Sequence, residues 1–337
     1  MLRSKTMKES LKTVCETMIR NRDLLKKQFR WESDYLYPVC ANIFLTEGAS
    51  PDSERLADCN RMIKESVGIF SNFRGNVRLP LICSLACDQD PQARWERAQG
   101  FYQIFKEHFF RSEFLALGAA MLAGSSKIDA ETLASRARIL YKRMKKEHPL
   151  LTGWEDSVSA LLLAQSTRDD DMLIEDVEQC YQLLRERMPI SDGLQTSAHV
   201  LAMSEEAPEQ KCARMLEIYD AVSSRCKKYG RSYELPMIAV LSFLDLPVET
   251  LAEEVAEAEQ YLHAQKGYRT IFGFDRRTRL MHAAMLVSTA NATGTAGELN
   301  GIVAQQASVI MAVIQQAIMC AVASSSAASA AAASSAH

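Results

Sequence analysis

The feature that most restricts the fold of this chain is a pattern that recurs about every forty residues. One marker is a leucine before a small residue at the end of an expected first helix. The other is a tyrosine late in an expected second helix. Both recur at intervals of 37 to 42 residues, and two independent markers with one period indicate internal repeats. The markers are Leu85, Leu122, Leu163, Leu201 and Leu241, and Tyr102, Tyr141, Tyr181, Tyr219 and Tyr261.

Each repeat is expected to be a hairpin of two helices. The second helices have apolar residues at helical spacing, and first helices such as "DSVSALLLAQ" are apolar on more than one side. Such a hairpin cannot bury both faces alone, so it has to stack on its neighbours, with the first helices as an inner layer. The sequence therefore predicts an all-α array of about seven antiparallel helix pairs with a period near 40 residues. We favour an open, α-solenoid-like array, with a closed α/α toroid as the alternative.

The predicted organisation is a single helical repeat domain followed by a tail. Gly and Pro are sparse in it, and few segments alternate apolar and polar residues as strands do. The expected parts are the domain over 1–323, made of an N-terminal helix (1–30), repeated helix pairs (31–290) and a C-terminal helix (299–323), and a low-complexity tail (324–337).

The segment 301–323 is uncharged and long enough to cross a bilayer. Its four glutamines, however, fall on one half of a helical wheel, and no Lys or Arg flanks the segment. We therefore expect a terminal helix packed on the last hairpin, and keep a membrane tether through 301–323 as an alternative. The glutamines are Gln305, Gln306, Gln315 and Gln316.

The turn inside each unit is encoded locally. Proline suits the first position of a helix because its missing N–H would have no partner there. Units without proline have carboxylates at the same place, and these can cap the free N–H groups of the next helix. The prolines are Pro51, Pro91, Pro208 and Pro247, and the carboxylates are Asp129 and Asp169 to Asp171.

The charges suggest a first candidate surface. Second helices begin with acidic residues and end mostly with basic ones, so parallel stacking would give one negative and one positive edge. This pattern complements the dipole of each helix, and the summed positive edge could also steer a partner with an acidic surface. The candidate residues on that edge are Lys145, Lys146, Lys227 and Lys228.

A second candidate surface lies in two aromatic blocks, "FRWESDYLYPVCANIF" and "GIFSNFRGNVRLPL". Aromatic and arginine side chains anchor many protein interfaces, although the first units of an array also need atypical contacts to close its end. The candidate residues are Trp31, Tyr35, Phe73 and Arg74.

No motif names a reaction. The run Asp169 to Asp171 with Glu175 resembles an acidic magnesium cluster, but it lies where other units start a helix. His108 and His148 occupy equivalent positions of successive repeats. Cys83 and Cys87 are one helical turn apart without a nearby histidine, so we expect no metal site and no cofactor. The acidic run and the two histidines belong to an alternative in which the chain is an enzyme with its active site inside a closed helical ring.

Charge and cysteine content limit the partners and the compartment. A net charge of −3 argues against a nucleic-acid partner, which would require a clustered basic face. The nine cysteines contain no C-x-x-C pair and are expected to be free thiols of a reducing compartment. We expect a cytoplasmic protein, and a membrane partner is not expected.

Through segments such as "FRWESDYLYP" (29–38) and "GIFSNFRGNVRLP" (68–80), the chain resembles a bacterial family of unknown function, number 4003. The resemblance runs through nearly the whole chain and implies a bacterial, cytoplasmic protein, but it transfers no functional residue. The repeats themselves favour a non-enzymatic scaffold that binds another protein, because an array of hairpins exposes a long surface relative to its mass. The resemblance is carried by "FRWESDYLYP" (29–38), "GIFSNFRGNVRLP" (68–80), "KKEHPLLTGWEDSV" (145–158), "LEIYDAV" (216–222) and "RLMHAAMLV" (279–287).

Overall fold

A computed structural model describes residues 7–125, 127–227, 229–269 and 273–292. Within these ranges the chain forms fourteen α-helices, one short 3₁₀ helix and no strand, so the all-α prediction is confirmed. The predicted C-terminal helix (299–323) and tail (324–337) lie outside the described residues. The helices are α1 (Glu9–Gln28), α2 (Leu36–Thr46), α3 (Ser53–Ser66), η1 (Asn72–Arg74), α4 (Arg78–Cys87), α5 (Pro91–His108), α6 (Glu113–Leu122), α7 (Ala130–Glu147), α8 (Asp156–Leu163), α9 (Asp170–Arg185), α10 (Asp192–Leu201), α11 (Pro208–Cys226), α12 (Leu235–Leu241), α13 (Val248–Ala264) and α14 (Arg276–Ala292).

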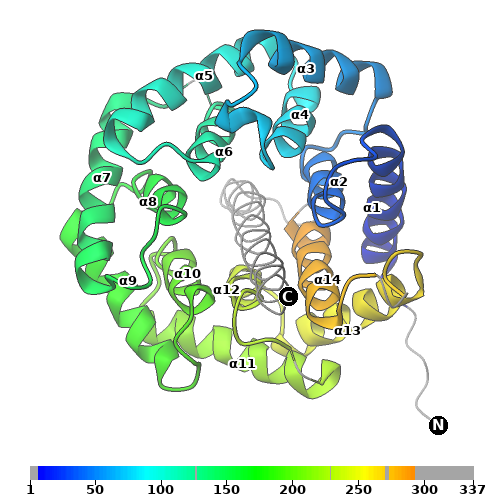
Figure 1. The fold of residues 1–337 in the computed structure, drawn as a ribbon. Helices are drawn as coiled ribbons and strands as arrows, with labels where there is room; N and C mark the ends of the chain where they lie inside the picture. Colours follow the sequence, from blue (N-terminus) through cyan, green and yellow to red (C-terminus); the bar gives the residue numbers. More distant parts are fainter. Residues whose placement is uncertain (1–6, 126, 228, 270–272, 293–337) are drawn as a thin grey trace, which may run out of the picture.

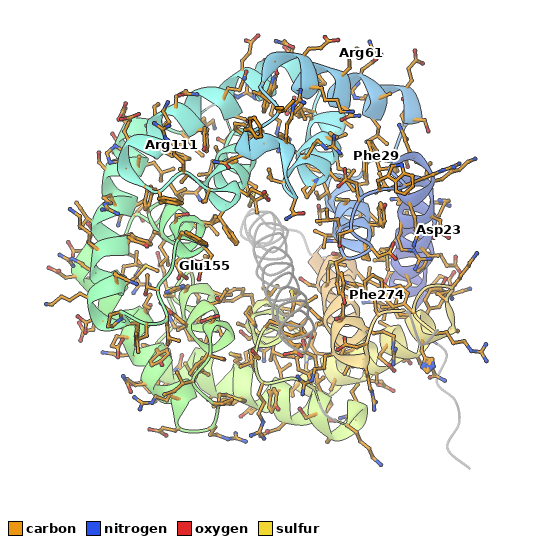
Figure 2. All side chains as sticks on the ribbon, in the orientation of Figure 1. Asp23, Phe29, Arg61, Arg111, Glu155 and Phe274 are labelled. Carbon is orange, nitrogen blue, oxygen red and sulfur yellow. The ribbon has the colours of Figure 1, made fainter. Side chains whose placement is uncertain are left out.

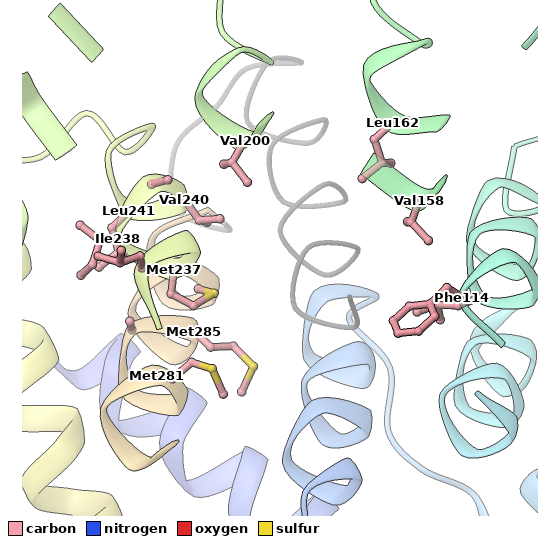
Figure 3. Close-up of a cluster of buried hydrophobic side chains, with 14 of the residues drawn as sticks. Phe114, Val158, Leu162, Val200, Met237, Ile238, Val240, Leu241, Met281 and Met285 are labelled. Carbon is pink, nitrogen blue, oxygen red and sulfur yellow. The ribbon is translucent and has the colours of Figure 1, made fainter. Parts of the chain in front are cut away.

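The helices form two layers around a common centre (Figure 1). Odd-numbered helices make the outer layer and even-numbered helices the inner layer. Every residue of α8 and of α12 is buried, whereas an outer helix such as α7 buries only one side. Figure 3 shows apolar side chains of the inner helices, among them Phe114, Val158 and Met285, which are all buried. The distribution of apolar residues along each helix therefore decides its layer.

The first and last described helices are neighbours. Helix α1 packs against α13 and α14, and α2 packs against α14. Polar contacts join the same elements: Thr289 Oγ1 donates to Asn42 Oδ1 (2.9 Å), and Lys8 Nζ donates to Asn291 Oδ1 (2.9 Å). The expected N-terminal helix is thus not an appendage, because it completes the ring of helices seen in Figure 1. These contacts fit the closed alternative and not the open array that the sequence favoured.

Arginines on outer helices hold the turn of the next helix pair. The turns follow the inner helices, whose last carbonyl groups have no partner within the helix. Arg214 on α11 donates through Nε to the carbonyl of Ser242 (2.8 Å) and through Nη2 to that of Leu246 (2.9 Å). Equivalent donors reach the turns after α6 and α8. They are Arg97 to the carbonyl of Ala123 (2.9 Å) and Arg136 to that of Ala164 (3.1 Å).

The starts of the outer helices follow the predicted chemistry. Asp129 and Asp169 accept backbone N–H groups at the starts of α7 and α9, as Asp90 does for α5. Pro91 and Pro208 are the first residues of α5 and α11. Pro51 and Pro247 are not the first residues of their helices. Pro51 precedes the capping residue Asp52, and Pro247 is the residue directly before α13.

We predict that Arg214→Met lowers the free energy of unfolding by about 2 kcal/mol, because it removes a charged donor from several turn carbonyls and keeps the aliphatic stem. The measurement is urea denaturation at neutral pH.

The matched control is Arg61→Met on α3, where the arginine is 63% exposed and pairs with Asp58 one turn away. A change within about 0.5 kcal/mol is expected for this variant. Equal losses in both variants would show that the turn contacts do not stabilise the ring.

Candidate interaction surface

The segments that lead from an outer helix to the next inner helix lie together on one rim. We call them the loop rim, and the segments from inner to outer helices the turn rim. In Figure 2, Arg111 and Glu155 mark two successive loops of the loop rim. Contacts connect each loop to the next loop or to the first turn of the inner helix that follows it: Glu32 with Arg78, Asn76 with Glu113, Phe110 with Trp154, and Thr152 with Gln195. The described loop rim comprises 29–35, 67–77, 109–112, 148–155, 186–191, 227, 229–234, 265–269 and 273–275.

Large apolar side chains protrude from the loop rim. Trp31, Phe70 and Leu150 are 98%, 94% and 97% exposed. Of the nine exposed large hydrophobic residues in the described ranges, seven belong to this rim, so the exposure is concentrated there and not scattered. The other two, Ile139 and Met172, lie on α7 and α9. The seven are Trp31, Ile69, Phe70, Phe110, Leu150, Trp154 and Ile190.

The two rims carry opposite charge. Among described residues, the loop rim exposes seven basic and three acidic side chains, and the turn rim exposes eight acidic and one basic, which makes the faces electrostatically distinct. The basic residues of the loop rim are Arg30, Arg111, Arg187, Lys227, Arg231, Lys266 and Arg269. Its acidic residues are Asp34, Glu186 and Asp275. The charged residues of the turn rim are Glu47, Asp52, Asp90, Asp129, Asp169, Glu205, Glu206 and Asp245, with Lys127.

The four predicted lysines lie at or beside the loop rim where they are described. Lys145 and Lys146 form the last turn of α7, and the ammonium group of Lys145 donates to the carbonyls of Pro149 (2.6 Å) and Thr152 (2.5 Å). Lys146 is exposed, and Lys227 ends α11 with a positive φ of 34°. Lys228 lies outside the described residues. Part of the predicted basic edge is therefore used to hold its own loop.

The predicted aromatic cluster is divided by the structure. Trp31 is exposed on the rim, but Phe73 is 3% exposed and packs edge-on against Trp95, with ring centroids 4.9 Å apart. Tyr35 is half-buried against Phe274, with centroids 5.3 Å apart. Arg74 donates to the carbonyl of Lys64. Of the four, only Trp31 is exposed, because Tyr35 and Phe73 pack against rings of other helix pairs and Arg74 binds the last turn of α3.

The exposed apolar rim residues that lie outside the two predicted aromatic blocks are Phe110, Leu150, Trp154 and Ile190. Each is a bulky apolar residue in a short polar segment between two helices, and that is the signal that could have identified it. Phe110 and Trp154 stack on each other with centroids 5.6 Å apart and an interplanar angle of 19°. Each lies in a different loop, so their proximity required the fold.

The acidic run and the histidines do not form a common site. Asp169 caps α9, Asp170 pairs with Arg136 and Asp171 pairs with Arg143. The two predicted histidines each face a glutamate of the following outer helix: His108 faces Glu131 (3.9 Å) and His148 faces Glu178 (2.8 Å). The described residues contain no group of three or more His, Cys, Asp or Glu that could hold a metal ion.

A groove of about 730 Å³ lies on the outer wall between α3 and α5. Its lining includes Arg55, Asp58 and Asp90, and Trp95 is buried at its base with Nε1 donating to Ser66 Oγ (2.8 Å). Asp90 caps α5, so part of the lining serves the helix start.

Buried polar side chains gather between α8 and α10. His199 is 1% exposed, with Nδ1 3.9 Å from Asp156 Oδ1, and within the described structure neither ring nitrogen has a hydrogen-bond partner. Burial, with the charge of His148 as a smaller cause, lowers the pKa of His199 to about 3. Burial raises the pKa of Asp156 to about 7, although the N–H of Gly153 donates to its Oδ2 (2.8 Å). At mildly acidic pH both groups are therefore neutral.

No helix in the described ranges has the length and apolar character needed to cross a membrane.

Comparisons with known proteins agree with the resemblance seen in the sequence. The family described as "Protein of unknown function (DUF4003)" matches residues 21–318. An uncharacterised protein of Bacillus subtilis (strain 168), YeaA, is 26% identical over 233 residues, which cover 66% of this chain and 70% of the relative. No solved structure matches the chain.

Phe70 is exposed and Phe73 is buried, so alanine variants of the two test which side chains of this loop belong to the surface. Phe73→Ala should lower the free energy of unfolding by about 3–5 kcal/mol, because it removes a buried ring from between two aromatic neighbours. Phe70→Ala should change it by less than about 0.5 kcal/mol, because the ring is exposed. Urea denaturation of both variants provides the comparison, and similar losses would contradict the assignment of Phe70 to the surface.

The buried carboxyl group of Asp156 predicts that the stability of the protein depends on pH. Since the folded pKa of Asp156 is raised from 3.8 to about 7, the folded state binds a proton that the unfolded chain has released, and stability falls as pH rises between these values. Asp156→Asn retains an acceptor for Gly153 but cannot ionise. The free energy of unfolding of this variant, relative to that of the wild type, should therefore increase by up to about 4 kcal/mol from pH 4 to pH 8.

Urea midpoints measured across this pH range test the sign. Asp58→Asn is the control, because Asp58 lies on the exposed face of α3 and its variant should run parallel to the wild type. A constant difference between Asp156→Asn and the wild type would mean that Asp156 is not held neutral by the fold.

Proposed function

We propose that this chain, which belongs to the family of unknown function DUF4003, is a non-catalytic binding protein that engages its partner through the loop rim. The observation that carries the proposal is the concentration of exposed large apolar side chains on one rim. Exposing such side chains to water is unfavourable, and contiguous or clustered exposure commonly marks an interaction site. Loops on a rigid helical frame are also the usual place for binding residues.

We further propose that the helix pairs are structural repeats. Two sets of contacts support this. Arg97, Arg136 and Arg214 each hold the turn of the next pair from a similar position on their helices. In addition, three of the marker tyrosines meet a ring from the end of the preceding outer helix or its loop. These pairs are Tyr102 with Phe73, Tyr141 with Phe109, and Tyr181 with His148. A repeated frame keeps its shape while its loops change.

The charge of the two rims specifies the partner in part. The excess of basic residues on the loop rim attracts a negatively charged surface, and the acidic turn rim repels it. A partner approaching at low ionic strength would thus be oriented toward the apolar side chains before contact. The sequence suggested a protein with an acidic surface, and the exposed apolar side chains add that the partner must also accept bulky hydrophobic groups.

The catalytic alternative receives no comparable support. The carboxylates of Asp169, Asp170 and Asp171 already cap a helix or pair with arginines, and the two predicted histidines lie in different units. The eight cysteines in the described ranges are free, and we propose a reducing compartment such as the cytoplasm for the protein.

Site-specific photocrosslinking in the native host tests the proposed function. A photoreactive phenylalanine analogue at position 31 or 70 should form adducts, because these positions would be covered by the partner. The same analogue at position 139 or 172 gives the control, because Ile139 and Met172 are also exposed but lie on the outer wall. Mass spectrometry of the purified protein detects both protein and lipid adducts. Equal yields at rim and wall positions would refute the loop rim as the binding surface.

A further inference from the structure

We infer that the partner of the loop rim is a membrane surface containing anionic lipids, which the protein binds from one side without crossing it. This inference rests on the proposed function and names the partner of the same surface. It differs from the tether through 301–323 considered from the sequence, because every residue that it uses lies in the described ring.

The distribution of the apolar side chains favours a membrane over a protein. They come from five consecutive loops, between α1 and α10, and so follow the rim instead of forming one patch. Protein hot spots usually cluster near the centre of an interface, in packed pockets. A bilayer is a continuous apolar phase beneath a polar surface, so separated side chains along one rim can each insert without a matching pocket.

The type and exposure of these residues fit the same partner. Trp31, Phe70 and Leu150 are almost fully exposed, so the folded protein provides little cover for them. Tryptophan and phenylalanine are favoured at the boundary between headgroups and acyl chains, where an aromatic ring can remain partly in contact with polar groups. Phe110 and Trp154 are stacked as a pair across two loops, which presents one broad apolar element.

The charges supply the second requirement for binding to a membrane surface. Basic residues lie among the apolar ones, such as Arg30 beside Trp31 and Arg111 beside Phe110, both exposed. Where the apolar residues end, Lys227, Arg231, Lys266 and Arg269 continue the rim. Each Lys or Arg near an anionic membrane contributes on the order of 1 kcal/mol, so several together make binding depend on lipid charge. The acidic turn rim would face away.

Vesicle flotation with the full-length protein tests the inference. One set of vesicles contains phosphatidylcholine mixed with phosphatidylglycerol, and the other contains phosphatidylcholine alone. The protein should float with the first set and much less with the second, and added salt should reduce binding. Tryptophan emission should shift to the blue on binding, and Trp31→Phe should diminish this shift, because Trp31 enters a less polar environment.

Two triple variants separate the contributions. Trp31→Ser, Phe70→Ser and Leu150→Ser together should weaken binding by more than about tenfold, because three inserting side chains are lost. Arg30→Glu, Arg111→Glu and Lys146→Glu together should weaken it by about a hundredfold on anionic vesicles, because three exposed positive charges at or beside the loop rim are reversed. The control, Ile139→Ser with Met172→Ser on the outer wall, should bind like the wild type. Circular dichroism verifies that each variant is folded.

Three results of the vesicle and light-scattering measurements would overturn the membrane inference. One is absence of binding to either vesicle type, and another is binding that does not respond to lipid charge. The third is a dimer, seen by light scattering, that does not bind vesicles and that becomes a monomer in the apolar triple variant. The loop rim would then be covered by a second copy of this chain. If rim positions crosslink only to a protein in the host, the proposed function stands and the lipid partner is wrong. If they crosslink no more than the outer wall, both fail.

Discussion

The fold depends on hydrogen bonds between successive helix pairs. The carbonyl groups at the end of an inner helix and in the turn after it have no partner within that helix. An arginine from the preceding outer helix supplies the donors, as Arg214 does for the turn after α12. At α9 the arrangement changes: Arg168, within the preceding turn, reaches the carbonyl of Ala202 (3.1 Å) and shares Asp176 with the buried Lys211. Every unit needs a neighbour, and closure of α1 onto α13 and α14 provides one for the last unit.

This division of roles leaves the loops with two functions. Side chains that point inward join the units, as Phe73 does between Trp95 and Tyr102. Side chains that point outward, such as Phe70 three residues earlier, are largely exposed to water and are available to a partner. Since the arginine contacts hold the turns on the opposite rim, the loop rim can carry water-exposed apolar residues without loss of the helical frame.

The sequence predicted the parts of this structure that local periodicity determines. The helix pairs, their two layers and the capping role of Asp169 follow from apolar spacing and turn chemistry. It failed for Tyr35 and Phe73, because an irregular loop has no period from which the inward and outward sides can be read. Closure of the ring was predicted only as the alternative to an open array. Closure depends on how successive helix pairs are oriented, which the sequence of one pair does not show, and on contacts such as Thr289 with Asn42, which are 247 residues apart.

The polarity of the rims can be explained without a partner, but the apolar side chains cannot. Aspartates such as Asp129 and Asp169 cap the starts of outer helices, and lysines such as Lys146 complement their ends. Because the outer helices all begin at the turn rim, these local effects add up to one acidic and one basic face. Helix electrostatics thus accounts for the charges whether or not they steer a partner. No such demand of the fold places Trp31 or Leu150 in water, so these residues are the more specific sign of binding.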